Sequence, residues 1–332
     1  MSGPIIAFCM GDPAGVGPEV TAKTLLDTAT YQSCRPFIVG DPKVMGDINQ
    51  VLRSNLEFRL IRDVDEACFL PSTVDVLCPP DLDVRNVRWG ALDPAMGQAA
   101  AVCLRTAFEL AMGGRVQGII SAPLNKEAFH RAGYPHRDEL SYAAELTHSP
   151  ETCIMGVMRS IWTVAVTEHV PFREILNAIR KERVLWHILK MNDVLLCTGL
   201  ARPRVAVAAL NVHGGEGGLF GREEIDEIAP AIQAARERGI DVQGPVPADA
   251  VFVRALAGLS DGVVCMYHDQ ANIARKLQPR SESATVFAGL PVPCGTTAHG
   301  TAFDIAGRGV ADPGSMQAAL RYTAQLAAGQ SR

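Results

Sequence analysis

Short hydrophobic runs alternate with longer amphipathic segments along most of the chain. The runs predict strands at Pro4–Met10, Pro36–Gly40, Gly118–Ala122, Ile161–Thr167, Arg204–Leu210 and Gly262–Tyr267. The longer segments have helical periodicity and span Pro18–Leu26, Gly97–Gly113, Arg173–Leu189, Arg222–Arg238 and Pro313–Leu326. Continuous hydrophobic strands between amphipathic helices indicate a mostly parallel sheet covered on both faces. The pattern therefore predicts an α/β protein.

The chain has 332 residues, which is long for one domain and fits two domains of about 150 residues. No internal repeat and no low-complexity linker marks a boundary. Composition alone therefore does not divide the chain, and an interwoven arrangement with both termini in one domain stays open.

Composition and charge exclude several classes of protein. Hydrophobic residues make up 48% and charged residues 20%, which excludes a disordered or fibrous chain. A net charge of -5 without a basic run argues against nucleic acid as a partner, and no apolar stretch is long enough to cross a membrane. The opening MSGPIIAF lacks a secretory signal, and the nine cysteines form no CxxC pair. We therefore expect a cytoplasmic globular protein.

A segment rich in glycine and proline, Gly11–Glu19, lies between the first predicted strand and the first helix. Its sequence, GDPAGVGPE, lets the backbone approach a ligand closely, and Pro18 leaves neighbouring N–H groups able to bind an anion. The glycine spacing excludes a GxGxxG fingerprint, and the segment lacks the GK[ST] ending of a P-loop. A plain strand-to-helix turn is the alternative.

Three histidines lie at the ends of predicted strands: His169, His213 and His268. Parallel strands bring their carboxyl ends to one edge of a sheet, where ligands bind. Three neutral imidazoles converging there would form an open metal site, and Asp269 could orient a ring as a hydrogen-bond acceptor. Each histidine could instead be structural, because their spacing has no local signature. A hydrolase that activates a metal-bound water is a further reading of the three histidines.

Two other segments carry candidate binding residues. The glycine-bounded segment Ala298–Gly309 contains a His, a Thr and Asp304, which could accept a hydrogen bond from a ribose hydroxyl; its alternative is a capped loop before the last helix. Lys126 stands at a helix start, where a cation is unfavourable unless it meets an anionic ligand. Lys276 is a similar candidate, and either lysine could also be a solvated surface residue.

Taken together, these segments resemble the 4-hydroxythreonine-4-phosphate dehydrogenase family of vitamin B6 biosynthesis. The resemblance covers nearly the whole chain through GDPAGVGPE, SAPLNKEA, VTEHVP, NVHGGEGGLFG, GPVPAD, MYHDQ and HGTAFDIAGRG. The last segment also looks like the loop that clasps the adenosine half of NAD(P) in isopropylmalate and isocitrate dehydrogenases.

The resemblance implies two α/β/α domains like those of isocitrate and isopropylmalate dehydrogenases, with the active site in the interdomain cleft. Residues 1–125 plus 290–332 would form a domain that contains both termini, and residues 126–289 a central domain with the dimer interface. The protein would be a homodimer with shared active sites.

The resemblance also implies roles for individual residues. His169, His213 and His268 would bind a divalent metal (Zn, Co, Mn, Ni or Mg), with one histidine from the neighbouring subunit. The NAD or NADP site would be lined by His299, Gly300, Thr301 and Asp304. The catalytic set would be Lys126, Lys276 and Asp269. NAD would take hydride from the carbon that bears the 3-hydroxyl, and the resulting β-keto acid would lose carbon dioxide.

The sequence departs from the family at the positions that contact the substrate. Where the family has Gly-His-Thr-Glu, this chain has Arg137 and Asp138 in place of the His and Thr. Lys276 matches the family's substrate-binding lysine, but Thr285 and Cys294 replace an Asn and an Arg, and Cys cannot replace a bidentate donor to phosphate. The resemblance therefore implies 4-hydroxythreonine 4-phosphate as the substrate or, for a paralogue, a four-carbon sugar-acid phosphate or a carboxylated cis-dihydrodiol. A non-catalytic paralogue is disfavoured because the metal histidines and the NAD-like loop are intact.

Overall fold

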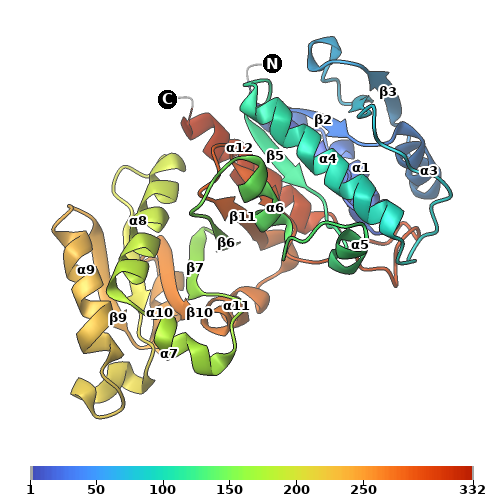
Figure 1. Ribbon diagram of the computed structural model, residues 1–332. Coiled ribbons are helices and arrows are strands. Elements are labelled where there is room, and N and C mark those ends of the chain that lie inside the picture. Colours follow the sequence, from blue (N-terminus) through green and yellow to red (C-terminus); the bar gives the residue numbers. More distant parts are fainter. Residues whose placement is uncertain (1–2, 331–332) are drawn as a thin grey trace. The chain divides into compact units, whose positions relative to one another are not determined.

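The computed structural model describes residues 3–330 and divides into two compact units (Figure 1). Unit 1 comprises Met1–Thr152 and Ala284–Arg332, and unit 2 comprises Cys153–Ser283. Residues 126–152 were expected in the central domain but belong to unit 1. The reason is local packing, because α5 (Lys126–Arg131) and α6 (Glu139–Leu146) contact α4 (Pro94–Met112).

Unit 1 contains a mostly parallel sheet. Its strands are β1 (Ile5–Cys9), β2 (Arg35–Val39), β3 (Glu57–Ile61), β4 (Thr73–Leu77), β5 (Gly118–Ser121), β11 (Ser283–Ala288) and β12 (Cys294–Thr296). They lie in the order β3-β4-β2-β1-β5-β12-β11, and only the pairing of β11 with β12 is antiparallel among these described strands. The chain therefore closes the sheet of unit 1 with strands from its last fifty residues.

Helices of unit 1 pack on this sheet. Besides α4, α5 and α6, they are α1 (Gly17–Leu26), α2 (Ala29–Ser33), α3 (Pro42–Leu52), the short η1 (Val64–Glu66) and α12 (Gly314–Gln330). Aspartate or asparagine caps several helix starts; Asp41 accepts from Lys43 N and Val44 N at the start of α3, for example. α12 contacts β5 and β12, where Gly118 and Gly295 leave no room for a side chain beside Thr323.

The strands of unit 2 lie in the order β6-β7-β10-β8-β9. The strands are β6 (Cys153–Met158), β7 (Ile161–Thr167), β8 (Arg204–Ala208), β9 (Asp241–Val246) and β10 (Gly262–Tyr267). β6 and β7 form an antiparallel hairpin, and the other neighbours are parallel. The predicted α/β class with mostly parallel strands is confirmed, and β7 and β10 have the bounds expected from the sequence.

The helical segments of unit 2 are shorter than the sequence pattern predicts. They are η2 (Phe172–Glu174), α7 (Ile175–Ala178), α8 (Lys181–Cys197), η3 (Val212–Gly218), η4 (Glu224–Ile228), α9 (Ala229–Arg236), α10 (Ala248–Leu256), α11 (His268–Lys276) and η5 (Arg280–Glu282). The prediction of one helix over Arg173–Leu189 is wrong, because the chain is extended at Ile179 and Arg180. Ile179 is fully buried there, and Arg180 pairs with Glu227, so tertiary contacts outweigh helical propensity.

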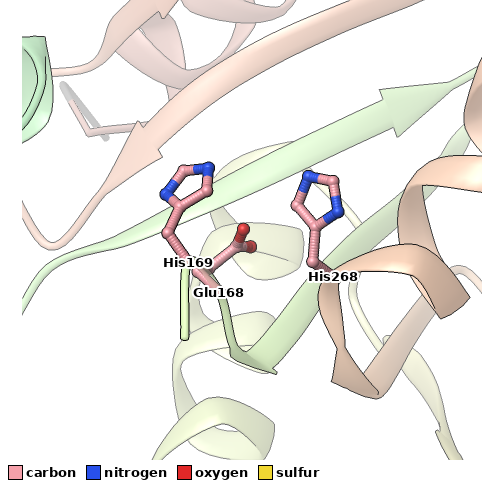
Figure 2. A group of neighbouring side chains, drawn as sticks. All are labelled: Glu168, His169 and His268. Carbon is pink, nitrogen blue, oxygen red and sulfur yellow. The ribbon is translucent and has the colours of Figure 1, made fainter. Parts of the chain in front are cut away.

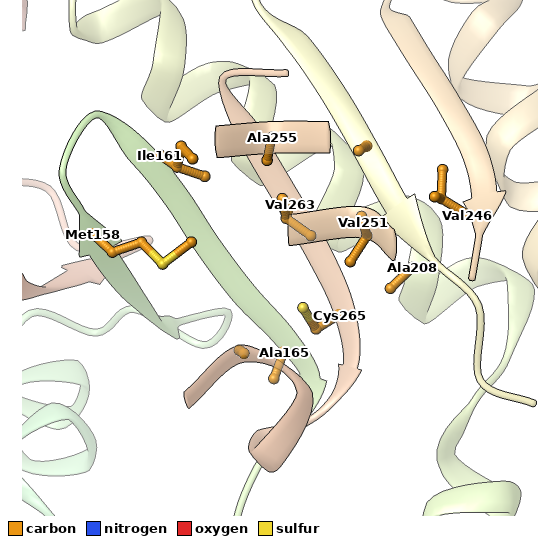
Figure 3. Packing of buried hydrophobic residues seen from close by; sticks show 11 residues of the cluster. Met158, Ile161, Ala165, Ala208, Val246, Val251, Ala255, Val263 and Cys265 are labelled. Carbon is orange, nitrogen blue, oxygen red and sulfur yellow. The ribbon is translucent and has the colours of Figure 1, made fainter. Parts of the chain in front are cut away.

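A core of small and branched side chains holds the strands of unit 2 against α10 and α11 (Figure 3). Ala165, Ala208 and Cys265 face Val251 and Ala271 across this core, and all are buried. Small residues in this core let the helices approach the sheet closely. Among residues 3–330, no helix is both long and apolar enough to span a membrane.

Candidate functional site

The carboxyl ends of β7 and β10 bring two of the predicted histidines together. The strands are parallel neighbours, and Thr167 of β7 lies opposite Tyr267 of β10. His169 follows β7 by two residues and His268 follows β10 directly, as the first residue of α11. The two imidazole rings are therefore close, with 5.7 Å between their centroids.

Glu168 completes a group of three candidate metal ligands. One ligand atom from each of Glu168, His169 and His268 lies within 4.8 Å of the others, and Figure 2 shows the carboxylate between the two rings. His268 Nδ1 contacts Asp269 Oδ1 at 2.7 Å, which orients the ring and leaves Nε2 for a metal. Two imidazoles and a carboxylate suit a divalent metal. The sequence pattern did not single out Glu168, although a carboxylate beside a histidine at a strand end was the available signal.

His213 is not a member of this group. It lies in η3, where five consecutive residues from His213 to Gly217 have positive φ values. Because of this left-handed turn, the chain does not continue in the direction of β8. The His213 imidazole is exposed, and its Nδ1 contacts Glu216 Oε1 at 3.2 Å. Of the three histidines expected to converge, His169 and His268 therefore lie together within this chain, and His213 does not.

A buried carboxylate holds the turn that carries His213. Glu224 Oε1 accepts hydrogen bonds from Leu210 N at 2.8 Å and Asn211 N at 2.7 Å, and Glu224 Oε2 accepts from Asn211 Nδ2 at 2.9 Å. Glu224 is 3% exposed, and a side chain at Gly215 would meet its Oε2 atom. Positive φ values at non-glycine residues persist only where surrounding contacts enforce them, and Glu224 supplies such contacts.

Gln270 of the MYHDQ segment ties neighbouring strand ends together. Its Oε1 accepts from Met266 N at 2.8 Å, and its Nε2 donates to Ala209 O at 2.9 Å. Because Met266 is the penultimate residue of β10 and Ala209 follows β8, the side chain fixes both strand ends beside His268. Gln270 therefore supports the site without being a ligand candidate.

The predicted nucleotide loop packs on the glycine-rich segment that follows β1. Val16 N donates to Thr301 O at 2.9 Å, and a Cβ atom at Gly15 would lie 2.9 Å from Thr301 Cβ. Gly90 likewise leaves no room for a side chain beside Phe303 O. Gly15 and Gly90 therefore let the backbone pack closely against the HGTAFDIAGRG loop, whereas Gly11 and Gly17 approach the backbone of Pro123 and Met10.

Two buried polar atoms near this junction have no hydrogen-bond partner among residues 3–330: Asp12 Oδ2 and His299 Nε2. Asp12 is fully buried, and burial raises the pKa of its carboxyl to about 6 although Ala14 N donates to Oδ1. Asp304 and Gly300 are exposed, and Thr301 is buried. Unpaired buried atoms beside an accessible loop fit a polar ligand such as a nucleotide.

Lys126 and a carboxyl with an altered pKa lie at the turn after β5. Lys126 is the exposed first residue of α5, which Asn125 caps, and Glu139 accepts a hydrogen bond from Leu124 N at 3.2 Å. Burial of the carboxyl raises the pKa of Glu139 to about 7, although Leu124 N–H, Ser121 and the charge of Lys126 oppose this shift. The sequence pattern did not identify Glu139 as a residue able to exchange a proton near neutral pH.

Replacing Glu139 by glutamine is expected to stabilise the protein above pH 7 and to change its stability little near pH 5. The folded-state pKa of about 7 exceeds the ordinary value of 4.5, so protonation favours folding; this contribution is complete below 4.5 and is lost as the pH rises through 7. Glutamine does not titrate, so above pH 7 the free energy of unfolding of the variant should exceed that of the native protein by at most about 3 kcal/mol. Urea unfolding across this range measures the difference, and a difference independent of pH contradicts the prediction.

Arg137 and Asp138 form an ion pair at the start of α6. Asp138 is buried and caps the helix, because its Oδ1 accepts from Ser141 N at 2.9 Å and its own backbone N–H donates to Ser141 Oγ at 3.0 Å. Arg137 Nε contacts Asp138 Oδ2 at 3.2 Å. Burial alone would raise the pKa of Asp138, but Ser141 and Arg137 lower it. The Asp138 carboxylate thus caps α6, and the exposed guanidinium of Arg137 offsets its negative charge.

Three remaining residues expected at the substrate differ in their placement. Lys276 is exposed at the end of α11. Thr285 is 8% exposed in β11, and Cys294 is fully buried in β12 between β5 and β11. Burial raises the pKa of the Cys294 thiol well above its ordinary value. Cys294 was expected to contact the substrate, but its side chain is fully buried in a strand that has a neighbour on each side.

Comparison with known proteins gives consistent results. A relative from Halalkalibacterium halodurans named "Putative D-threonate 4-phosphate dehydrogenase" is 38% identical over 98% of this chain and 97% of its own length. A crystal structure of a 4-hydroxythreonine-4-phosphate dehydrogenase from Burkholderia phymatum is 39% identical, covers 98% of this chain and 99% of that chain, and has a TM-score of 0.86.

A more distant solved structure is a terephthalate 1,2-cis-dihydrodiol dehydrogenase from Burkholderia xenovorans. It is 28% identical, covers 97% of this chain and 98% of that chain, and has a TM-score of 0.69. The family model described as "Pyridoxal phosphate biosynthetic protein PdxA" matches residues 32–323. With the family model over most of its length and these relatives over nearly all of it, the chain belongs to the PdxA family.

Proposed function

We propose that the protein is a divalent-metal- and NAD(P)-dependent dehydrogenase that oxidises and decarboxylates a 3-hydroxy acid. The observation that carries this proposal is the Glu168–His169–His268 group in a family whose relatives are named dehydrogenases of hydroxy-acid phosphates. All nine cysteines lie in the described residues as free thiols, in keeping with a place in the cytoplasm.

His169, His268 and Glu168 would hold the metal, and His299, Gly300, Thr301 and Asp304 would bind the nucleotide. When both are bound, the metal polarises the oxygen at the reacting carbon and NAD accepts the hydride, so that carbon dioxide can leave. The donor set and the unpaired atoms of Asp12 and His299 fit these two groups.

The remaining residues would bind the substrate and move protons. The exposed guanidinium of Arg137 can pair with a phosphate or carboxylate through two N–H groups. Lys126 and Lys276 are exposed cations that suit an anionic substrate, and Glu139 can exchange a proton near pH 7. Asp269 would keep the His268 ring in the tautomer that presents Nε2.

For the substrate we propose a four-carbon acid 4-phosphate. Two of the compared relatives carry names of this class, D-threonate 4-phosphate and 4-hydroxythreonine 4-phosphate, and the latter would link the protein to pyridoxal phosphate biosynthesis. Both acids have a 3-hydroxyl and a terminal phosphate, and they differ at carbon 2. A carboxylated cis-dihydrodiol is the second candidate, because the terephthalate dihydrodiol dehydrogenase also aligns over nearly the whole chain.

We further propose a homodimer whose sites are shared. Large apolar side chains next to His169 and His213 in the chain are exposed: Val170, Phe172, Leu176, Val212, Leu219 and Phe220. Phe172 and Leu219 are 74% and 75% exposed, which is costly unless another chain covers them. A second copy that covers this surface could bring its own His213 to the first copy's Glu168 group.

Formation of reduced nicotinamide with D-threonate 4-phosphate, 4-hydroxythreonine 4-phosphate and a carboxylated cis-dihydrodiol tests the proposed function. We expect turnover with one of the two phosphates, its loss on chelation, and its recovery when Zn, Co, Mn, Ni or Mg is added back singly. Turnover with the dihydrodiol alone would select the second candidate. No nicotinamide reduction with any of the three would refute the dehydrogenase assignment.

Replacing Arg137 by alanine is expected to raise the KM for the phosphorylated substrate by about ten- to a hundredfold, because a bidentate charged contact is lost. Steady-state kinetics at saturating NAD measures this change. Arg131→Ala is the control, since Arg131 is an exposed arginine of α5 that pairs with Glu127. An equal effect of both substitutions would remove Arg137 from the substrate site.

A further inference from the structure

We propose that Glu19 and Lys23 of α1 are positioning residues for the nucleotide loop. This inference rests on the proposed function for the identity of the nucleotide, and it assigns a role to a side-chain pair outside the loop itself. Neither residue would touch the cofactor; both would hold the loop in the conformation that binds it.

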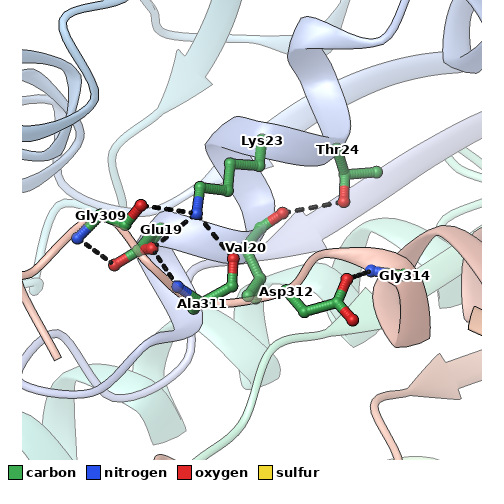
Figure 4. A network of polar contacts seen from close by, with 8 residues as sticks. All are labelled: Glu19, Val20, Lys23, Thr24, Gly309, Ala311, Asp312 and Gly314. Carbon is green, nitrogen blue, oxygen red and sulfur yellow. Dashed lines mark hydrogen bonds and ion pairs between the residues drawn. The ribbon is translucent and has the colours of Figure 1, made fainter. Parts of the chain in front are cut away.

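Glu19 and Lys23 bind the end of the loop reciprocally (Figure 4). The fully buried Glu19 carboxylate accepts from Gly309 N at 3.1 Å and Ala311 N at 2.7 Å. Lys23 Nζ donates to Gly309 O at 3.0 Å and Ala311 O at 2.6 Å, and it contacts Glu19 Oε1 at 2.8 Å. Two side chains one helical turn apart therefore satisfy both backbone groups of two loop residues.

The same helix also holds the beginning of the loop. Val16, just before α1, donates its N–H to Thr301 O at 2.9 Å. Thr301 and Ala311 are thus both fixed to one rigid element, and the exposed Asp304 lies between these two anchors. Beyond the second anchor, Asp312 Oδ1 accepts from Gly314 N at 2.8 Å, where α12 begins.

This arrangement lowers the cost of ordering the loop when the nucleotide binds. A loop that is already held in its binding conformation loses less conformational entropy on binding, so affinity rises without a new contact. The pair is buried, with only 19% of the Lys23 side chain exposed, so added salt screens it weakly. Loss of the pair should therefore weaken nucleotide binding more than it changes turnover at saturating NAD.

Glu19→Gln in the full chain tests this role. We expect the Kd for NAD, measured by calorimetry, to rise about tenfold or more. We also expect faster hydrogen exchange across residues 301–311 without NAD, and metal affinity and kcat at saturating NAD within about twofold of wild type. Lys23→Met, which keeps the carboxylate and its two N–H partners, is the second variant and should shift both readouts in the same direction.

Asp75→Asn is a matched control. Asp75 is also a fully buried carboxylate of unit 1; it accepts from Cys68 N at 2.8 Å and Phe69 N at 3.0 Å and pairs with Arg59. It does not hold the nucleotide loop, so its loss should lower stability without changing the Kd for NAD. Equal weakening by Asp75→Asn and Glu19→Gln would overturn the inference, because general destabilisation would explain both.

The outcomes separate this inference from the proposed function. Wild-type protein that binds neither NAD nor NADP refutes the dehydrogenase assignment, and the cofactor role of the pair falls with it. Wild-type protein that binds NAD, with unchanged affinity and unchanged loop exchange in both variants, overturns the positioning role alone. If Glu19→Gln does not fold, Lys23→Met decides by the same two measurements.

Discussion

Replacing His169 by alanine is expected to lower turnover by about a thousandfold or more and to weaken divalent-metal binding by about a hundredfold, because one of the clustered imidazole donors is lost. His169 is exposed, so the variant should remain folded. Turnover with NAD and metal binding by calorimetry measure the two effects. His148→Asn is the control, since it removes another exposed imidazole and asparagine tolerates the positive φ at that position.

Mixing His169→Ala with His213→Ala subunits tests whether the site is shared. Either variant alone should be inactive. A mixed dimer in which the partner donates His213 has one site with both native histidines, so dissociation and reassociation of the mixture should restore up to about half the activity per mixed dimer. Full activity of His213→Ala alone would remove this residue from the metal site. No recovery on mixing, with both variants inactive, would contradict the shared site.

Replacing Glu224 by alanine is expected to lower the free energy of unfolding by about 2 to 4 kcal/mol, because two partly buried backbone N–H groups lose their acceptor and the Asn211 amide loses one of its two. The left-handed turn would lose its main restraint, and with the shared site proposed above we expect metal binding to weaken as well. Urea unfolding measures the first effect, and metal calorimetry at a temperature where the variant is folded measures the second.

Glu223→Ala provides the comparison for this substitution. Glu223 is the neighbouring carboxylate, and it accepts a hydrogen bond from the Asn211 side chain, through Nδ2, at 2.7 Å. The Glu223→Ala substitution should lower the free energy of unfolding by less than about 1 kcal/mol, because the Glu223 side chain is partly exposed. If both substitutions have the same small effect, Glu224 does not restrain the turn.

The strand ends that carry His169 and His268 could be predicted from the sequence. Their strands are continuous hydrophobic runs with clear ends, and parallel pairing places a residue after β7 beside a residue after β10. His213 could not be placed in this way, because its position depends on a left-handed turn and on Glu224, which follows it by eleven residues. Glu168 was missed for a simpler reason: a single carboxylate next to a histidine has no distinctive spacing.

Two other differences between the sequence-based predictions and the structure involve buried residues. Cys294 was expected at the substrate because a family position aligns with it, but the short strand β12 has no periodicity that would reveal its place between two strands. The break at Ile179 and Arg180 is similar, since a buried isoleucine and an ion pair interrupt a segment that has helical periodicity throughout. Contacts distant in the sequence determine both features.

The order in which the chain builds unit 1 has a consequence for its synthesis. β5 needs β12 as its neighbour, yet β12 leaves the ribosome only after all of unit 2. Until then the edge of β5, whose four residues are all buried in the folded protein, lacks its partner strand and α12, and such an edge can pair with another nascent chain. A fragment that ends at Thr152 lacks β11, β12 and α12 and should therefore aggregate. Unit 2 is one contiguous stretch, so the fragment Cys153–Ser283 contains all of its strands from β6 to β10.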